Sequence, residues 1–106
     1  MNKMENDRDR HAIERLLRYM HEHCTEPFDA KKHASMIFFS ESKLNKVFKL
    51  YVGVGPGAYF RRLRIQKAME LYQQGIKSWT EVSHIVGYAD LPSFSKAFKK
   101  FSAFCL

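Results

Sequence analysis

The segment SESKLNKVFKLY, residues 40–51, returns fifty residues later as DLPSFSKAFKKF, residues 90–101. In both copies apolar side chains recur at steps of three and four residues, which is the spacing of one face of an α-helix. Leu44 aligns with Phe94, and polar side chains, many of them lysines, occupy the remaining positions. Each copy therefore predicts a helix that buries one face and presents cations on another.

Four more helices are predicted around these two copies, at about residues 9–24, 29–36, 56–74 and 78–86. The first shows an amphipathic apolar period, and the others are bounded by residues that start or stop helices. These boundary residues are Pro27, Asp29, Pro56, Gly75, Ser78 and Gly87. No alternating strand pattern has turn residues on both sides, so the chain is predicted to be all-α.

Each copy of the repeat combines a short helix, a tight turn and a second helix, which is the helix-turn-helix arrangement. The sequence thus predicts two helix-turn-helix subdomains with homeodomain-like halves, joined by a long central helix. We place the first subdomain at residues 9–55 and the linker helix at 56–75. The second subdomain, which is short at its C-terminal end, occupies residues 76–106.

The positive charge is concentrated in the later part of the chain. Lys and Arg number 18 against 11 Asp and Glu, and residues 40–106 hold 11 of the basic residues but only four of the acidic ones. A helix with an apolar back and a cationic front fits a DNA major groove about 12 Å wide. Asn45 suits adenine edges, and Lys46 or Lys96 suits guanine edges. Lysines further along the two helices suit phosphates: Lys49, Lys99 and Lys100.

The central helix sets the spacing between the two predicted reading helices. About 18 residues give a rod of about 27 Å, and helices that read one face of a duplex lie about 34 Å apart. One chain is therefore expected to bind two half-sites, in successive major grooves of double-stranded DNA, as a monomer.

A longer series of residues follows in a fixed order and spacing: Ala34, Ser40, Leu44, Phe48-Lys49, Gly53, Tyr59, Arg64, Ala68, Leu71, Val82-Ser83, Gly87-Tyr88, Asp90, Ser93-Phe94-Ser95 and Phe98-Lys99-Lys100. Over about residues 10–103 this series resembles the DNA-binding domain of AraC/XylS transcription regulators. The resemblance implies seven helices, of which the third and sixth read DNA. It places DNA contacts on Ser42, Asn45, Lys46, Lys49, Leu91, Pro92, Ser95, Lys96 and Lys99. We add four cations to the candidate site: Lys43, Arg61, Arg62 and Lys100.

Three departures from the family pattern carry expectations of their own. Phe38 stands where the first turn usually has glycine, so a strained or shifted turn is expected. Leu91-Pro92 replaces residues that are often polar, so the second half should read bases less stringently. The chain ends in Ala103-Phe104-Cys105-Leu106, whereas the family continues with glycine, a Ser-Pro pair and a seventh helix. Residues 76–106 are therefore expected to be the less stable half.

Other classes of site are not favoured by the sequence. His21, His23 and Cys24 do not share one helix face, so no metal site is expected. No nucleophile elbow, P-loop or carboxylate pair is present, so neither an enzyme nor a cofactor is expected. No apolar run approaches the roughly 20 residues of a membrane span, which favours a cytoplasmic protein without a membrane partner. Arg64 is expected to be structural, bonding to helix ends or to an acid within the core.

The sequence therefore favours a bacterial transcription regulator that binds DNA sequence-specifically and acts as an activator, as most of the family do. RNA polymerase is a candidate second partner. Two alternatives stay open. One is a truncated copy that binds weakly or competes with an intact relative, and the other is a helical protein-interaction module. A DNA titration at several salt concentrations separates the three.

Overall fold

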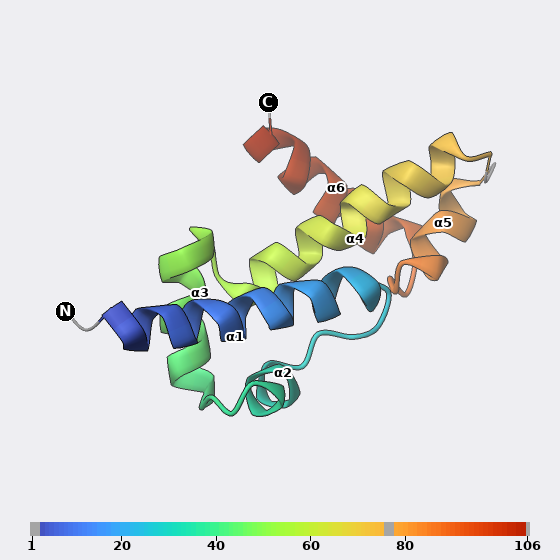
Figure 1. The fold of residues 1–106 in the computed structure, drawn as a ribbon. Coiled ribbons are helices and arrows are strands. Elements are labelled where there is room, and N and C mark those ends of the chain that lie inside the picture. The colour runs from blue at the N-terminus through green and yellow to red at the C-terminus, as the bar shows by residue number, and fades with distance from the viewer. Residues whose placement is uncertain (1–2, 76–77, 106) are drawn as a thin grey trace. The chain divides into compact units, whose positions relative to one another are not determined.

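The computed structural model describes residues 3–75 and 78–105, with side chains described from residue 7 to residue 101. The described residues form helices and contain no strand, which confirms the all-α prediction (Figure 1). The helices are α1 (Lys3–Glu22), α2 (Ala30–Met36), α3 (Glu41–Val52), α4 (Pro56–Gln73), α5 (Trp79–Ile85) and α6 (Leu91–Cys105).

Side-chain caps start four of these helices, because each satisfies a backbone N–H that has no partner within the helix. Asp29 Oδ1 accepts from Lys32 N at 3.2 Å, and Ser40 Oγ accepts from Lys43 N at 3.1 Å. The caps of α5 and α6 are Ser78, which accepts from Glu81 N, and Asp90, which accepts from Ser93 N. The bonds from Ser93 lower the pKa of the Asp90 carboxyl group.

The first helix is longer at its start than the sequence predicted. It was expected at about residues 9–24 but spans Lys3–Glu22. Its first turns have no apolar stripe for the periodicity to detect. An ion pair three residues apart, between Arg10 and Asp7 at 3.1 Å, supports the helix there.

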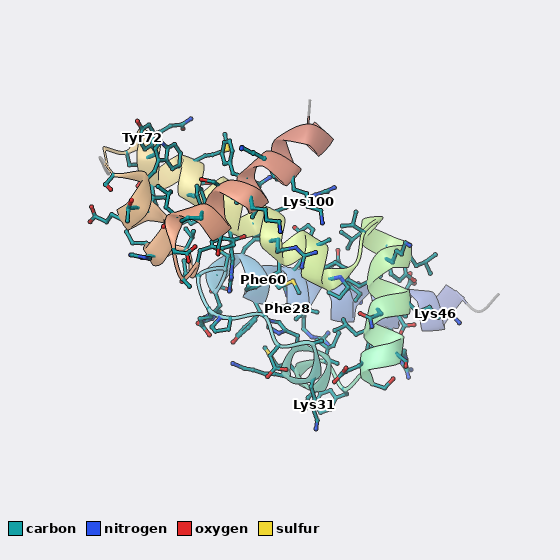
Figure 2. All side chains as sticks on the ribbon, turned by 180° about the vertical axis from the view of Figure 1, so that it is seen from behind. Phe28, Lys31, Lys46, Phe60, Tyr72 and Lys100 are labelled. Atoms are coloured by element: carbon teal, nitrogen blue, oxygen red, sulfur yellow. The ribbon has the colours of Figure 1, made fainter. Side chains whose placement is uncertain are left out.

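The first compact unit contains residues up to 23 and residues 28–60. Helices α1 and α2 both pack against α3. The buried ring of His33 lies against Phe28 at 5.0 Å and Phe60 at 5.7 Å between ring centroids. Phe28 and Phe60 are labelled in Figure 2. Its Nδ1 donates to the backbone oxygen of Asp29 at 2.7 Å. The apolar core consists of Ala12, Ile13, Leu16, Met20, Ala34, Ile37, Leu44, Val47, Phe48 and Phe60.

The second unit contains residues 24–27 and the chain from residue 61 onward. Its buried cluster consists of Ile65, Ala68, Val82, Val86 and Phe94, with further hydrophobic side chains partly buried against it. Arg64 ties the segment 24–27 to α4, since Nε donates to Cys24 O at 3.2 Å and Nη2 donates to Glu26 O at 2.5 Å. Burial lowers the pKa of this guanidinium. The structural role expected of Arg64 is thus confirmed.

The turns between α2 and α3 and between α5 and α6 have the same hydrogen bonds. Phe38 N donates to Ser35 O and Gly87 N donates to His84 O, each at 3.1 Å. Both residues have a positive φ, 61° for Phe38 and 96° for Gly87. The first turn is therefore not shifted. Phe38 adopts the backbone conformation that glycine usually adopts at this point of the turn. Of the two expected outcomes, a strained turn or a shifted one, the structure shows the strained turn.

Candidate nucleic-acid interface

The outer face of α3 presents four of the expected site residues on one stripe. Ser42, Asn45, Lys46 and Lys49 are all exposed, and their spacing of i, i+3, i+4 and i+7 puts them on the same side of the helix. Figure 2 shows Lys46 on this helix. The opposite side of α3 is buried in the first unit through Leu44, Val47 and Phe48. The core thus fixes which face of α3 remains open to a partner.

Lys43 lies at the side of this stripe and is already engaged within the first unit. Its Nζ lies 3.4 Å from Asp9 Oδ1 on α1 and 4.5 Å from the centroid of the Phe39 ring. The ammonium group is therefore partly balanced by a carboxylate and an aromatic face. Lys43 thus ties α3 to α1 within the first unit.

The outer face of α6 repeats the arrangement of α3 with different chemistry. Pro92, Lys96, Lys99 and Lys100 are exposed. Pro92 is the second residue of α6, where an N–H would have no partner within the helix, so proline does not interrupt it. The stripe therefore has three cations and lacks the amide that α3 offers at Asn45.

Two expected contacts of the second half lie in a groove beside this stripe. Leu91 and Ser95 are half-buried and line a groove of about 250 Å³ together with Trp79, Phe94 and Phe98. Leu91 also packs against the buried cluster of the second unit. The structure thus gives Leu91 an apolar environment within its own unit and leaves Ser95 at the border of the exposed stripe.

The two arginines of the candidate site lie on α4. Arg61 is exposed and Arg62 is half-buried. Burial raises the pKa of Tyr88, and the charges of Arg64 and Arg61 lower it by less. Among the described residues, Tyr88 Oη is the one buried side-chain oxygen or nitrogen without a hydrogen-bond partner.

Three exposed residues of the first unit were missed by the sequence analysis. Leu50 is 72% exposed and lies seven residues beyond Lys43, which places it at the side of the stripe on α3. Lys31 and Lys32 are exposed in the first turn of α2, and Lys31 is labelled in Figure 2. A helical wheel of residues 41–52 would have found Leu50, since it is an apolar residue outside the apolar face.

Neither a metal cluster nor a membrane-spanning helix occurs in the described part of the chain. Histidine, cysteine, aspartate and glutamate side chains do not gather in groups of three or more that could hold an ion. No described helix is both long enough and apolar enough to cross a bilayer.

Comparison with known proteins places this surface in context. The model of the helix-turn-helix domain family matches residues 33–103. The transcriptional regulator GbdR of Pseudomonas aeruginosa is 27% identical over 89 residues, which are 84% of this chain and 24% of that protein. The uncharacterized regulator YidL of Escherichia coli is 32% identical over 93 residues, 88% of this chain and 31% of that protein. The chain thus spans about a quarter to a third of these relatives.

Solved structures of AraC-type proteins superpose on this chain. A transcriptional regulator from Chromobacterium violaceum, with an AraC-type DNA-binding domain, superposes with a TM-score of 0.81 at 26% identity, covering 92% of this chain and 85% of that one. The C-terminal domain of AraT from Geobacillus stearothermophilus gives a TM-score of 0.78 at 25% identity, covering 85% of this chain and 75% of that one. Together with the match over residues 33–103, these similarities show that the chain belongs to the AraC-type helix-turn-helix family of DNA-binding transcription regulators.

Proposed function

We propose that this protein binds a specific site on double-stranded DNA through α3 and α6 and regulates transcription as an activator. The observation that carries the proposal is the repeated stripe of exposed donors and cations at aligned positions of α3 and α6. A helix face that only contacts solvent has no reason to repeat the same donors and cations at aligned positions. A protein that places two helices in successive major grooves of one duplex has such a reason.

In the proposed complex, α3 enters a major groove and its stripe meets the base edges. The Asn45 amide pairs with the N6 and N7 atoms of an adenine, and Lys46 donates to a guanine. Ser42, in the first turn, lies close enough to the helix start to donate to a base or a phosphate. Lys49, two turns further on, neutralises a phosphate at the groove wall.

The second helix contributes mainly charge to the proposed complex. Lys96 reaches a guanine edge, and Ser95 adds one hydroxyl at the margin of the stripe. Lys99 and Lys100 bind phosphates, and Leu91 and Pro92 offer only apolar contact. Arg61 and Arg62 on α4 supply further phosphate contacts.

The two reading halves in this proposal are residues 9–55 and 76–106, and residues 56–75 join them. One monomer covers two half-sites about one helical turn apart. The protein acts in the cytoplasm, and RNA polymerase is its second partner at the promoter. The relatives that support activation by name are RhaS and RhaR of Pectobacterium atrosepticum, each described as a transcriptional activator.

A salt titration tests the proposal directly. Each neutralised phosphate contributes about 0.9 to the slope of log affinity against log salt concentration. With most of the exposed cations engaged, we expect a slope of roughly five or more on a selected genomic fragment. Lys49→Ala should reduce the slope by about one. A slope near zero, with tight binding to a protein, would favour the interaction module. Weak binding at every salt concentration would favour the truncated copy.

A further inference from the structure

An ion pair between Lys43 and Asp9 joins the first reading helix to α1. The Lys43 Nζ atom lies 3.4 Å from Asp9 Oδ1, and the two side chains are 48% and 23% exposed. The ion pair within α1, between Arg10 and Asp7 at 3.1 Å, has side chains that are 54% and 57% exposed. Asp9 is therefore the less hydrated of the two carboxylates, and salt screens its attraction to Lys43 less.

The Phe39 ring holds the same ammonium group from the turn before α3. Nζ of Lys43 lies 4.5 Å from the ring centroid, well inside the range of about 6 Å in which a ring face attracts a cation. Two groups from outside α3 thus hold this lysine. Lys46 and Lys49, on the exposed stripe, have no carboxylate partner among the residues that the structure describes.

The position of Lys43 on α3 would allow it to bind DNA if it were released. It lies three residues before Lys46, which is about 60° around the helix at about 100° per residue. The lysine stem is long and flexible, so a released ammonium group can swing toward the phosphates beside the groove that α3 enters in the proposed complex. What Lys43 contributes to binding therefore depends on the group that holds it.

We propose that Asp9 is a positioning residue that holds the Lys43 ammonium group against α1 and keeps it away from the DNA phosphates. The inference rests on the proposed DNA binding and adds a carboxylate that limits how many cations α3 offers to the backbone. Withholding a phosphate contact lowers affinity for all sequences alike, because such contacts carry no sequence information. The base contacts of Asn45 and Lys46 then account for a larger share of the binding.

The experiment replaces the phosphates of a footprinted site, one at a time, by neutral methylphosphonates. In the wild-type background, Lys43→Ala should change the sensitivity at no position. Asp9→Asn should add one sensitive phosphate, raise the salt slope by about 0.9 and tighten binding about two- to fivefold on specific and scrambled fragments alike. Adding Lys43→Ala to Asp9→Asn should remove the new position. Asp9→Glu, which keeps a carboxylate, should keep the wild-type pattern.

Asp7→Asn is the matched control for the loss of a negative charge. It removes the same charge from the same helix and frees Arg10, which does not lie on α3, so it should add no sensitive phosphate. A general loss of repulsion between α1 and DNA would tighten binding without adding a discrete position in Asp9→Asn. That result overturns the inference.

The remaining outcomes separate this inference from the function on which it rests. Failure of the wild type to bind DNA in a salt-dependent way overturns both. Normal binding in which Lys43→Ala alone removes a sensitive phosphate overturns the inference only, since Lys43 then contacts DNA in spite of Asp9. Far-UV circular dichroism checks that each variant is folded. If Asp9→Asn unfolds, Lys43→Ala in the wild-type background still decides the question.

Discussion

Phe38 and Gly87 occupy the same place in the two copies of the repeat, yet their surroundings differ. A Cβ atom added at Gly87 would lie 3.0 Å from the backbone oxygen of Thr25 and 3.3 Å from Cζ of Arg64. Phe38, in contrast, is 93% exposed. At Gly87, both the positive φ and the close neighbours favour a residue without a Cβ. At position 38, only the positive φ favours glycine. An L residue is therefore tolerated at position 38, at an energetic cost.

The reading helices differ in a parallel way. On α3, the core side is fully buried at Phe48, and on α6 the aligned Phe98 is only half-buried beside the open groove. The exposed stripe of α3 also has more varied chemistry. It consists of Ser42, Asn45, Lys46 and Lys49, against Pro92, Lys96, Lys99 and Lys100 on α6. The first copy is thus suited to discrimination among bases and the second to charge neutralisation.

The largest expected effect comes from truncating the aligned phenylalanines. Phe48→Ala should reduce the free energy of unfolding of the first unit by about 3–5 kcal/mol, because a fully buried ring leaves a cavity. Phe98→Ala should reduce that of the second unit by clearly less, since its ring already faces an open groove. Amide exchange measures each unit separately, and Trp79, the one tryptophan of the chain, reports the second unit by fluorescence. Equal losses would contradict the difference in packing.

A smaller effect is expected at the second turn. Gly87→Ala should destabilise the second unit by about 2 kcal/mol, because the left-handed backbone disfavours a Cβ and because Thr25 O and the Arg64 guanidinium would have to shift by a few tenths of an ångström to accommodate one. The Arg64 bonds to Cys24 O and Glu26 O should loosen with it. The measurement is urea unfolding followed by Trp79 fluorescence. Gly75→Ala, in the same unit, is the control for backbone strain alone, since its φ is 106° and nothing lies within 4 Å of an added Cβ there. A loss no larger than that of the control would show that the close contacts are harmless.

Base discrimination should also differ between the copies. Asn45→Ala should cost about 1–3 kcal/mol at one base pair and little at the others. Ser95→Ala should cost less, because a half-buried hydroxyl at the margin of the stripe makes at most a single weaker contact. Affinities for sites with every base substituted in turn, measured by fluorescence anisotropy, compare the two variants. If both half-sites discriminate equally, the division of roles between α3 and α6 is wrong.

The parts of this structure that the sequence predicts are those set by local chemistry. Asp29, Ser40 and Ser78 could be recognised as caps because a cap acts within four residues of itself. The buried faces of α3 and α6 follow from periodicity alone. The early start of α1 was not predictable in this way, since its first turns are stabilised by polar pairs and have no apolar face.

Features that depend on contacts distant in sequence escaped prediction. Lys43 pairs with Asp9, 34 positions earlier in the chain, so its partial neutralisation is invisible in a local pattern. The half-buried state of Leu91 and Ser95 depends on Trp79 of α5, which lines the same groove. The residues of the exposed stripe could be predicted from the sequence. The exposed fraction of each side chain and its contacts within the protein could not.

The smallest expected effect is a gain of stability at the first turn. Phe38→Gly should stabilise the first unit by up to about 1 kcal/mol, because glycine adopts a φ of 61° without the strain of a Cβ, partly offset by its greater freedom in the unfolded chain. The exposed Phe38 ring has little packing to lose. Phe39→Gly is the matched control. Phe39 is half-buried and its ring contacts the Lys43 ammonium group, so this change should destabilise the first unit. The free energy of opening of α3, from amide exchange, measures both. A loss of stability in Phe38→Gly would mean that the ring supports the turn more than the backbone conformation strains it.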